Sequence, residues 1–540
     1  METRLLIAGE QVAGAGTPLA VENPATEATV ATVGSASAEQ VDAAIAAARA
    51  AAPAWADTPA LERAELLHEV ATRLRDRTDE IARAMTLEGG KPLVENADEV
   101  GWTAAAFDYY AEIGRNFAGR VIPPIESSQV ALVLKEPLGV VAAIVPWNYP
   151  LLLLAWKLAP ALAAGNAVVC KPSELTPLST LMLAPCLDHL PAGTVSLLAG
   201  AGDVGEAIVA DARVDCVAFT GSVATGKRIA ARCAERIARI NLELGGKDPF
   251  IVCADVAADI DVAARGGAWA AYLNAGQVCT SAERFYVHDS LFDDYVAAFA
   301  EHTRTLVVGD PLAAGTDIGP MVSAAQRAKA AAQVDAAVAA GAELVCGGDS
   351  AGHDRGHYYA PAVVVGAPAD TDLLREETFG PVAPIVAVRS LDEAIELANG
   401  TRFGLGANVY TRDLARGIRP PVLQDRGLAA AVRELHKRLG TVGRHLTDLS
   451  KKLNSTVEQF NKLTCSIERS QCVFGIQALF VSRRSLSSQT IHDCGLSDRS
   501  RAKTSRFEKN GLRVFRDFGV TCSHYSGNCT YLRLVSYHEH

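Results

Sequence analysis

The sequence predicts an α/β protein built from two α/β domains and an additional C-terminal segment. At 540 residues the chain is too long for one ordinary hydrophobic core. Its hydrophobic content of 49% suits a globular protein of two or more domains. Beyond residue 139, short β-rich runs alternate with helical runs in two successive series. This alternation is typical of mainly parallel sheets that are covered by helices.

The first part of the chain is predicted to be helical. Between residues 39 and 115 apolar residues recur with helical spacing, and one of these runs ends at the pair Gly89-Gly90, which suits a helix C-cap. Residues 127–139, "SSQVALVLKEPLG", then alternate between polar and apolar types. We therefore expect a half-buried strand or hairpin between the helices and the first β-rich series.

The stretch from Leu138 to Cys170 is apolar enough to suggest a membrane span, but polar residues and prolines interrupt it repeatedly. The interruptions are Pro146, Asn148, Pro150, Lys157 and Pro160. A lipid-exposed helix does not tolerate such a set, so we expect this stretch to form buried α/β interior. The sequence thus predicts no membrane protein.

The net charge of −11 hides a division within the chain. Residues 1–417 carry 31 Lys and Arg against 52 Asp and Glu, whereas residues 418–540 carry 20 against 10. Alanine, which is abundant in the first part, almost vanishes after Ala431, while Ser, Arg and Cys become frequent. Two segments of different composition have therefore been joined.

The cysteines fall into two kinds of surroundings. Cys170 and Cys253 lie in apolar, strand-like runs, where a cysteine behaves as a small hydrophobic residue. Cys279, in "NAGQVCTSAER", is set among small and polar residues, and a reactive thiol needs such access. The seven cysteines before residue 418 are irregularly spaced and form no CxxC pair, which predicts reduced thiols and a cytoplasmic protein.

Two glycine-containing turns are candidates for binding phosphate. "CVAFTGSVATGKRIA" places a strand, a turn at Gly221-Ser222 and a helix in succession, which directs backbone N–H groups and the helix dipole at an anion such as a dinucleotide pyrophosphate. The alternative is an ordinary βα turn. "GAGDVG", Gly200 to Gly205, matches GxGxxG, but no acidic residue about 20 positions later closes a second strand, as that fingerprint requires.

"VCKPSELTP" ends a predicted strand with Lys171 and Glu174 three residues apart. Such a pair suits the hydroxyls of a ribose, and the carboxylate would repel a 2′-phosphate, which favours NAD over NADP. A surface ion pair is the alternative interpretation.

Two further segments carry candidate catalytic groups. "INLELGGKDP" places Glu243 after an apolar strand, and a carboxylate in apolar surroundings suits a general base near neutral pH. "VPWNYP" holds Asn148 between two prolines, and a rigid amide donor is what an oxyanion hole needs. Capping of strand ends is the alternative for both.

Taken together, six segments narrow these alternatives. In chain order they are "PWNYP", "KPSELTP", "FTGSVATG", "LELGGKDP", "GQVC" and "EETFGPV". From about residue 5 to Asp413 the chain resembles the NAD(P)-dependent aldehyde dehydrogenase superfamily. The resemblance implies a Rossmann-type NAD-binding domain (1–116 and 139–245), an oligomerisation hairpin (117–138) and an α/β catalytic domain (246–417).

The resemblance also implies a reaction and a set of site residues. The Cys279 thiolate would attack an aldehyde, the oxyanion would be held by the backbone N–H of Cys279 and the amide of Asn148, and Glu243 would activate the water that hydrolyses the thioester to a carboxylic acid. NAD would be bound by fifteen residues. These are Ile144, Pro146, Trp147, Lys171, Ser173, Glu174, Gly202, Gly205, Phe219, Thr220, Gly221, Ser222, Leu244, Glu377 and Phe379.

The substrate pocket is expected to include Tyr149, Trp156 and Leu273. Tyr149 and Trp156 are seven residues apart, hence on one face if helical, and match two of the four aromatic positions that enclose ammonium groups in betaine and aminoaldehyde dehydrogenases. Leu273 stands where that subgroup carries an aromatic residue. Ordinary apolar pocket or core positions are the alternative.

The C-terminal part departs from the family after Gly417. Apolar residues recur there at alternating spacings of four and three, at Leu428, Val432, Leu435, Leu439, Val442, Leu446, Leu449 and Leu453. This heptad pattern predicts a helix or coiled coil within 418–470, and residues 428–463 are faintly similar to the C-terminal helix of RmuC-type DNA recombination proteins. Residues 471–540 lack sustained periodicity and metal-ligand spacing, which predicts a basic tail of low order rather than a nucleic-acid or metal site.

Two functions from different classes follow. The first is an NAD-dependent aldehyde dehydrogenase that assembles into a homo-oligomer, a dimer or tetramer, and takes a small-molecule aldehyde. The second is an inactive NAD-binding remnant, or a fusion protein whose helix recruits a partner. The missing family strand would leave an exposed sheet edge and apolar surface, so impaired stability is expected.

Overall fold

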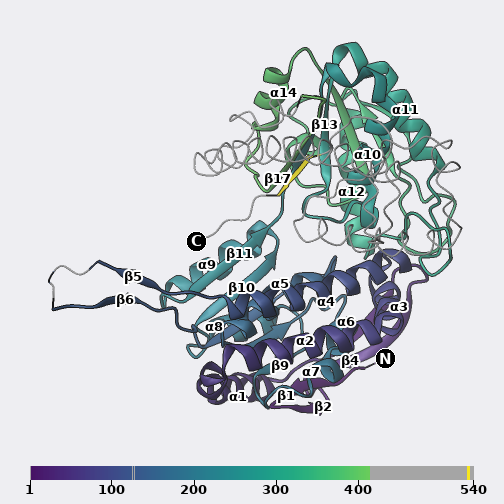
Figure 1. The fold of residues 1–540 in the computed structure, drawn as a ribbon. Coiled ribbons are helices and arrows are strands. Elements are labelled where there is room, and N and C mark those ends of the chain that lie inside the picture. Colours follow the sequence, from purple (N-terminus) through teal and green to yellow (C-terminus); the bar gives the residue numbers. More distant parts are fainter. Residues whose placement is uncertain (1, 124–125, 127, 414–531, 536–540) are drawn as a thin grey trace, which may run out of the picture. The chain divides into compact units, whose positions relative to one another are not determined.

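The computed structural model of the protein describes residues 2–123, 126, 128–413 and 532–535 (Figure 1). The predicted helix or coiled coil at 418–470 lies outside the described residues, as does most of the predicted tail at 471–540. Among the described residues, 2–410 and 534–535 belong to one compact unit. The two large sheets, apart from part of the last strand, belong to this unit.

The first large sheet has seven strands in the order β11-β10-β7-β8-β9-β1-β2. Their bounds are β1 (Leu5–Ile7), β2 (Glu10–Val12), β7 (Val140–Ile144), β8 (Ala167–Lys171), β9 (Val195–Leu197), β10 (Cys216–Gly221) and β11 (Arg239–Leu244). The strands from β11 to β9 pair in parallel, whereas β1 pairs antiparallel with both β9 and β2. This confirms the predicted mainly parallel sheet with helices between its strands.

Four helices precede this sheet's central strands and confirm the prediction for residues 39–115. They are α1 (Ala38–Asp57), α2 (Ala60–Asp76), α3 (Thr78–Gly89) and α4 (Leu93–Arg115). Ser37 and Gln40 form a capping box at the start of α1. At the predicted C-cap, Gly90 is left-handed with φ 78°, so the glycine ends α3 as expected. The later helices of this sheet are α5 (Pro150–Ala163), α6 (Leu178–Leu181), α7 (Ala184–Leu187), α8 (Gly202–Ala210) and α9 (Val223–Ala234).

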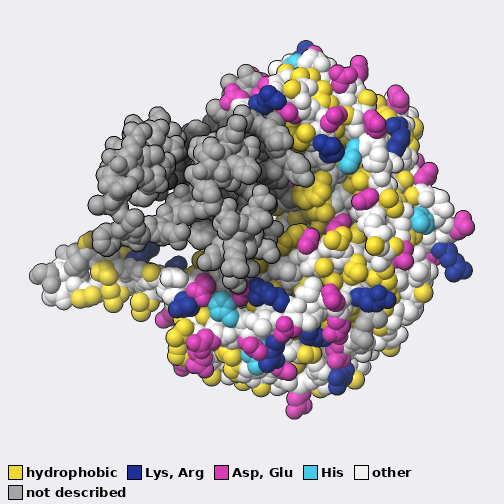
Figure 2. Space-filling model, turned by 45° about the vertical axis from the view of Figure 1, so that its right-hand side comes forward, with side chains coloured by type: hydrophobic (Ala, Val, Ile, Leu, Met, Phe, Trp, Pro, Cys, Tyr) yellow, Lys and Arg dark blue, Asp and Glu magenta, His cyan; other side chains and the backbone are white. Residues whose placement is uncertain are grey.

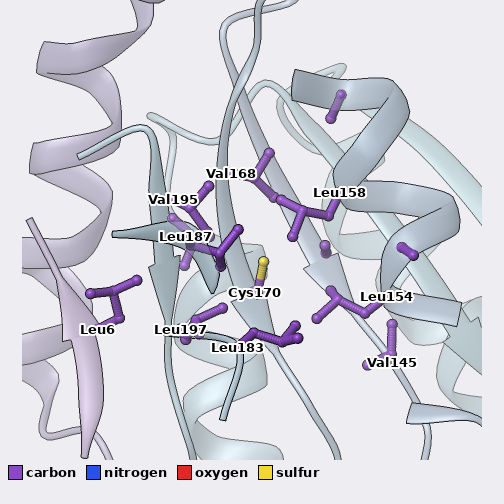
Figure 3. Packing of buried hydrophobic residues seen from close by; sticks show 14 of the residues in the cluster. Leu6, Val145, Leu154, Leu158, Val168, Cys170, Leu183, Leu187, Val195 and Leu197 are labelled. Carbon is purple, nitrogen blue, oxygen red and sulfur yellow. The ribbon is translucent and has the colours of Figure 1, made fainter. Parts of the chain in front are cut away.

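The apolar stretch from Leu138 to Cys170 forms β7, α5 and β8, and most of it is buried as predicted. Figure 3 shows the sulfur of Cys170 among side chains such as Leu158 and Leu197, and burial raises the pKa of this thiol. Cys170 is therefore a structural cysteine. In the portion of the chain that the structure describes, no helix has both the length and the hydropathy needed to span a bilayer.

The second large sheet has the order β14-β15-β16-β13-β12-β17-β18. Its strands are β12 (Asp248–Val252), β13 (Ala282–His288), β14 (Glu343–Cys346), β15 (Ala362–Val365), β16 (Val382–Val388), β17 (Gly406–Tyr410) and β18 (Leu532–Val535). The central pairs from β15 to β17 are parallel, and β14 is antiparallel to β15. Its helices are α10 (Ile260–Tyr272), α11 (Phe292–Thr305), α12 (Ala324–Ala339), α13 (Asp372–Arg375) and α14 (Leu391–Ala398), with 3₁₀ turns η1 (Ala254–Asp259), η2 (Leu273–Gly276) and η3 (Asp289–Leu291).

Two antiparallel hairpins complete the fold. They are β3 (Pro18–Asn23) with β4 (Ala28–Gly34), and β5 (Arg120–Ile122) with β6 (Ala131–Val133). The second hairpin extends away from the two large sheets (Figure 1), and hydrophobic side chains gather along it (Figure 2). The expected hairpin is present, since residues 127–139 contribute β6 to it. The expected half burial is wrong: Val130, Leu132 and Leu134, like Val121 on β5, are more than half exposed, because no other layer of the described residues covers them.

Candidate active site

Cys279 follows the turn η2 and precedes β13, and it is partly exposed. The sequence contrast between cysteines is reflected in burial, since five others are buried. These are Cys170, Cys186, Cys216, Cys233 and Cys253. Cys346 is also partly exposed, and burial raises its pKa, so exposure alone does not single out Cys279. Cys279 is distinguished instead by the conformation and contacts of the segment around it.

The turn before Cys279 is left-handed over three successive residues. Asn274, Ala275 and Gly276 have φ values of 50°, 53° and 70°. This conformation costs a non-glycine residue about 1–2 kcal/mol, so the surroundings must hold it. Glu95 does so by accepting the backbone N–H of Asn274 at 3.1 Å. At Gly276 only glycine fits, because a Cβ there would lie 2.1 Å from the carbonyl oxygen of Gly380.

Asn148 is brought to this turn from the first sheet. It follows β7, is 5% exposed, and its Nδ2 donates to the carbonyl oxygen of Gln277 at 2.9 Å. Its Oδ1 is buried without a hydrogen-bond partner among the described residues. The amide predicted as an oxyanion donor thus contacts the segment that carries the predicted nucleophile. The contact is at Gln277, two residues before Cys279.

Glu243 occupies the edge strand β11 and is only partly exposed. The expectation that it follows a buried apolar strand is wrong: β11 includes Glu243 and is exposed over its first three residues, because β10 alone pairs with it. The connection after it contacts the cysteine segment, since a Cβ at Gly246 would lie 2.9 Å from the carbonyl oxygen of Cys279.

Lys157 is a site residue whose role the sequence did not reveal. It lies on α5, is 7% exposed, and its Nζ donates to Thr220. Burial lowers the pKa of Lys157 to about 8, although Glu243 and Cys279 act electrostatically in the opposite direction. Both predicted catalytic groups therefore lie within electrostatic range of one buried ammonium. The available signal was a lysine within an otherwise apolar helix.

The turn after β10 has the strand–glycine–helix arrangement predicted from the sequence as a candidate phosphate site. β10 ends at Gly221 and α9 begins at Val223, with the Ser222 hydroxyl capping the helix through Thr225 N at 3.2 Å. A Cβ at Gly221 would lie 2.5 Å from Cζ of Phe219, so the close approach of the Phe219 ring to the backbone of residue 221 needs glycine. Of the predicted cofactor residues, Thr220 lies in β10 and Leu244 ends β11.

The ends of three parallel strands bring further predicted cofactor residues together. Ile144, the last residue of β7, is in register with Phe219 of β10 on one side and Lys171 of β8 on the other. Lys171 is buried and donates to Pro172 O at 2.8 Å, while Glu174 and Asp203 interact with it electrostatically.

Gly205 of α8 faces the same lysine, because a Cβ there would lie 3.6 Å from its Cδ. Gly202 begins α8 with no heavy atom within 4 Å of a Cβ position. Ser173 accepts from the backbone N–H of Leu175. The crevice at the carboxyl ends of parallel strands is where such sheets bind nucleotides.

The segment "EETFGPV" belongs to the second sheet and contacts the first. The rings of Trp147 and Phe379 meet edge to face at 5.4 Å, and Pro146 immediately precedes the tryptophan. Phe379 is left-handed with φ 55° and is held by Glu283, which accepts the backbone N–H of Phe379 at 2.8 Å. Burial, followed by the charge of Glu283, raises the pKa of Glu377 to about 7.

A buried ion pair supports this segment and was not predicted from sequence. Lys247 Nζ contacts Glu283 at 2.7 Å and donates to the Thr378 hydroxyl at 2.9 Å, and Glu283 also accepts the backbone N–H of Thr378 at 2.7 Å. Lys247 and the Thr378 N–H bind one carboxylate oxygen of Glu283, and the Phe379 N–H binds the other, so the buried carboxylate has partners for both oxygens, which limits the penalty of burying it.

The predicted substrate residues occupy different surroundings. Tyr149 stands outside the helix, as the N-cap of α5, and is 8% exposed, with Lys91 Nζ 3.8 Å from its ring centroid. Trp156 is within α5 and 41% exposed, and Leu273 is partly exposed. The assumption that Tyr149 and Trp156 share a helix face is wrong, because the helix begins one residue after the tyrosine.

Two α/β sheets, a glycine turn between β10 and α9, and a buried amide bonded to the segment that carries Cys279 are the features expected of a dinucleotide-dependent oxidoreductase. Residues 12–420 match the model of the aldehyde dehydrogenase family. The chain belongs to this family, and the predicted class of enzyme, which oxidises aldehydes with a nicotinamide cofactor, is confirmed.

Among relatives, the chain is 39% identical over 419 residues to succinate-semialdehyde dehydrogenase [NADP(+)] GabD of Escherichia coli, covering 77% of this chain and 86% of the relative. It is 42% identical over 412 residues to 3,6-anhydro-alpha-L-galactose dehydrogenase of Streptomyces coelicolor, covering 74% and 82%. A solved betaine aldehyde dehydrogenase of Staphylococcus aureus, in complex with NAD+, superposes with a TM-score of 0.74 at 34% identity, covering 77% of this chain and 84% of that chain.

Proposed function

We propose that the protein oxidises an aldehyde to a carboxylic acid through a covalent intermediate on Cys279. The main support is the 2.9 Å hydrogen bond from Asn148 Nδ2 to Gln277 O. This bond joins an amide that follows a strand of the first sheet to the segment that carries Cys279, next to the second sheet. The amide of Asn148 has two hydrogens, and one of them is directed at Gln277. The other is available for the oxygen of an aldehyde bound at Cys279.

The steps follow from the residues around the thiol. The sulfur of Cys279 attacks the aldehyde carbon, and the Asn148 amide with the backbone N–H of Cys279 stabilises the resulting oxyanion. NAD, when held at the strand ends and at the turn at Gly221, would supply the acceptor for the hydride that this carbon must lose to become a thioester on the sulfur. Glu243 then removes a proton from the water that releases the acid. Lys157, the buried cation near both groups, stabilises negative charge there.

We assign the cofactor to the strand ends Ile144, Lys171 and Phe219 and to the turn at Gly221. A 2′-phosphate would meet the exposed carboxylate of Glu174, which supports NAD over NADP. The relatives include both cofactor types: the Escherichia coli relative is named as an NADP(+) enzyme, and the Staphylococcus aureus structure is a complex with NAD+. The other cofactor residues predicted from sequence are proposed in the same roles.

The aldehyde pocket is proposed to include Trp156 and Leu273. Tyr149 contributes less than the sequence suggested, because one face of its ring is already covered by the ammonium of Lys91. A cationic aldehyde therefore finds no free cation–π site on that face.

We further propose that the chain assembles into homo-oligomers in the cytoplasm. The hairpin at 117–138 supports assembly, since Val121, Val130, Leu132 and Leu134 expose 76%, 79%, 57% and 72% of their surface. The edge strand β11 adds Ile240, which is 42% exposed. The predicted domain boundaries at residues 116, 138, 245 and 417 are retained as proposals.

The test of function is NADH production from propanal and from an aminoaldehyde by the full chain and by its Cys279→Ser variant. We expect turnover by the full chain and loss of more than a thousandfold in the variant, with NAD binding retained in both. NAD binding without turnover in the unmodified chain would instead identify an inactive remnant. Equal turnover in both chains would exclude Cys279 as the nucleophile.

A further inference from the structure

The backbone carbonyl of Asn148 is held as firmly as its side chain. Asn274 Nδ2 donates to Asn148 O at 3.1 Å and lies 3.3 Å from Gln277 O, the same oxygen that receives the Asn148 amide. A single side-chain amide therefore binds both the backbone of the oxyanion donor and the acceptor that orients this donor. Asn274 is itself buried, with 3% exposure.

The bridge is rigid at both ends. On the turn side, Gln277 Nε2 donates to Asn274 O at 3.0 Å, and Gln277 Oε1 accepts from Val322 N at 2.9 Å. On the helix side, the buried carboxylate of Glu99 accepts the N–H groups of Leu151 and Leu152, each at 3.0 Å. These bonds fix the start of α5 directly after Asn148.

A buried cation completes the helix side. Lys91 forms an ion pair with Glu99, and its Nζ lies 3.5 Å from Asn148 O. The carbonyl of Asn148 thus receives two donors, the ammonium of Lys91 and the amide of Asn274.

We propose that Asn274 is a positioning residue that aims the Asn148 amide at the substrate oxygen. This inference rests on the proposed oxyanion role of Asn148. The left-handed backbone at position 274 explains why an asparagine stands there. Asparagine tolerates φ 50° better than most residues, and it carries the bridging amide. Displacing a catalytic donor by about 1 Å costs on the order of a hundredfold in rate.

The test uses Asn274→Gly, because glycine keeps the left-handed backbone while the bridging amide is removed. We expect kcat/KM for the aldehyde to fall about 30- to 100-fold. Acylation of Cys279 by p-nitrophenyl acetate, which passes through an oxyanion, should fall by a similar factor. Alkylation of Cys279 by iodoacetamide needs no oxyanion donor and should change less than threefold, as should the Kd of NAD.

Ala275→Gly is the matched control, because it alters the adjacent left-handed residue, φ 53°, without removing an amide. Its kcat/KM should stay within threefold of the unmodified chain. The decisive comparison repeats Asn274→Gly in the Asn148→Ala background, where the loss should shrink to less than threefold because the positioned group is gone.

Three results would overturn the inference. They are an unchanged acylation rate in Asn274→Gly, a parallel loss of alkylation and acylation, and a full additional loss in the Asn148→Ala background. Failure of the proposed function looks different, because the unmodified chain would then neither reduce NAD with aldehydes nor accept an acyl group on Cys279.

Discussion

The unpartnered oxygen of Asn148 is the single-residue feature that most directly indicates chemistry. A buried amide oxygen without a hydrogen bond costs about 1–3 kcal/mol of folding free energy. A residue with only a structural role would be expected to have a donor for this oxygen, or an apolar side chain in its place. The opposite end of the same amide is directed at the cysteine segment. The position is therefore better explained by its N–H groups than by its contribution to folding.

For Asn148→Ala we expect a loss of about 10²–10³ in kcat, the usual cost of removing one oxyanion donor. Steady-state kinetics with saturating NAD measure it. Thermal stability should fall only slightly, because removing the unpartnered oxygen partly offsets the loss of the buried hydrogen bond to Gln277 O. A large fall in melting temperature together with the fall in kcat would instead indicate a structural role.

Glu377 gives the site a pH dependence. Its pKa is raised from 4.5 to about 7, so the carboxylate forms mainly above neutral pH. If it accepts a hydrogen bond from the nicotinamide ribose, NAD affinity should rise about tenfold between pH 6 and pH 8. Titration calorimetry should show this rise in the unmodified chain and a flat profile in Glu377→Gln.

The same shift has a consequence for stability. A raised pKa in the folded state means that the stabilising contribution of the protonated carboxyl is complete below about pH 4.5 and is lost as the pH rises through about 7. Glu377→Gln should therefore match the unmodified chain near pH 5 and be the more stable at pH 8. Equal stability of the two chains at both pH values would contradict the raised pKa.

Short segments that carry their own chemistry were the easiest to single out in the sequence. Cys279 stood out by its small, polar neighbours and Asn148 by its flanking prolines, and the structure places the Asn148 amide 2.9 Å from the carbonyl oxygen of Gln277, two residues before Cys279. Asn274 and Lys157 were missed because their partners are remote: Asn274 bonds to a residue 126 positions away and Lys157 to one 63 positions away. Local patterns contain no information about such contacts.

Among the elements, α5 is notable because side chains from other helices satisfy both of its ends. Glu99 of α4 accepts its first N–H groups, and Arg63 of α2 donates to Ala163 O at 3.1 Å. Arg63 also donates to Ala56 O at 3.2 Å and to Thr58 O, at the end of α1. One guanidinium therefore serves the carbonyl groups at the ends of two helices.

Arg63→Ala should lower the free energy of unfolding by about 1–3 kcal/mol, because several partly buried carbonyl groups lose their donor. Chemical denaturation followed by tryptophan fluorescence measures the change. The control is Arg389→Ala, which removes an 82% exposed guanidinium from a surface ion pair and should leave the free energy of unfolding nearly unchanged. Equal effects of the two substitutions would contradict the assigned role of Arg63.

Element types were predictable to different degrees. The helices between residues 39 and 115 were predicted because helical periodicity and the Gly90 cap are local properties. The exposure of β11 and of the β5–β6 hairpin was not, because apolar strand sequences look the same whether another layer covers them or not. Ile237, just before β11, is an example: it is apolar, yet 92% of its surface is exposed.

At the scale of the whole molecule, exposed hydrophobic surface on the hairpin predicts self-association. Leu132→Asp should shift the chain to a smaller species in light scattering coupled to size exclusion, because a carboxylate cannot be buried without a partner. Glu126→Ala, on the same hairpin, is the control and should leave the mass unchanged. A monomeric unmodified chain, or an unchanged mass for Leu132→Asp, would exclude the hairpin as the interface.

The hydrogen bond between Asn148 and Gln277 has a consequence for biosynthesis, because it joins residues 129 positions apart. The last strand of the first sheet ends at Leu244, which is translated 35 residues before Cys279. An interrupted translation product that stops between these points would have every strand of the first sheet and no nucleophile. Such a fragment would have no group to form the covalent intermediate, and it would lack Glu377 and Phe379 of the proposed cofactor site.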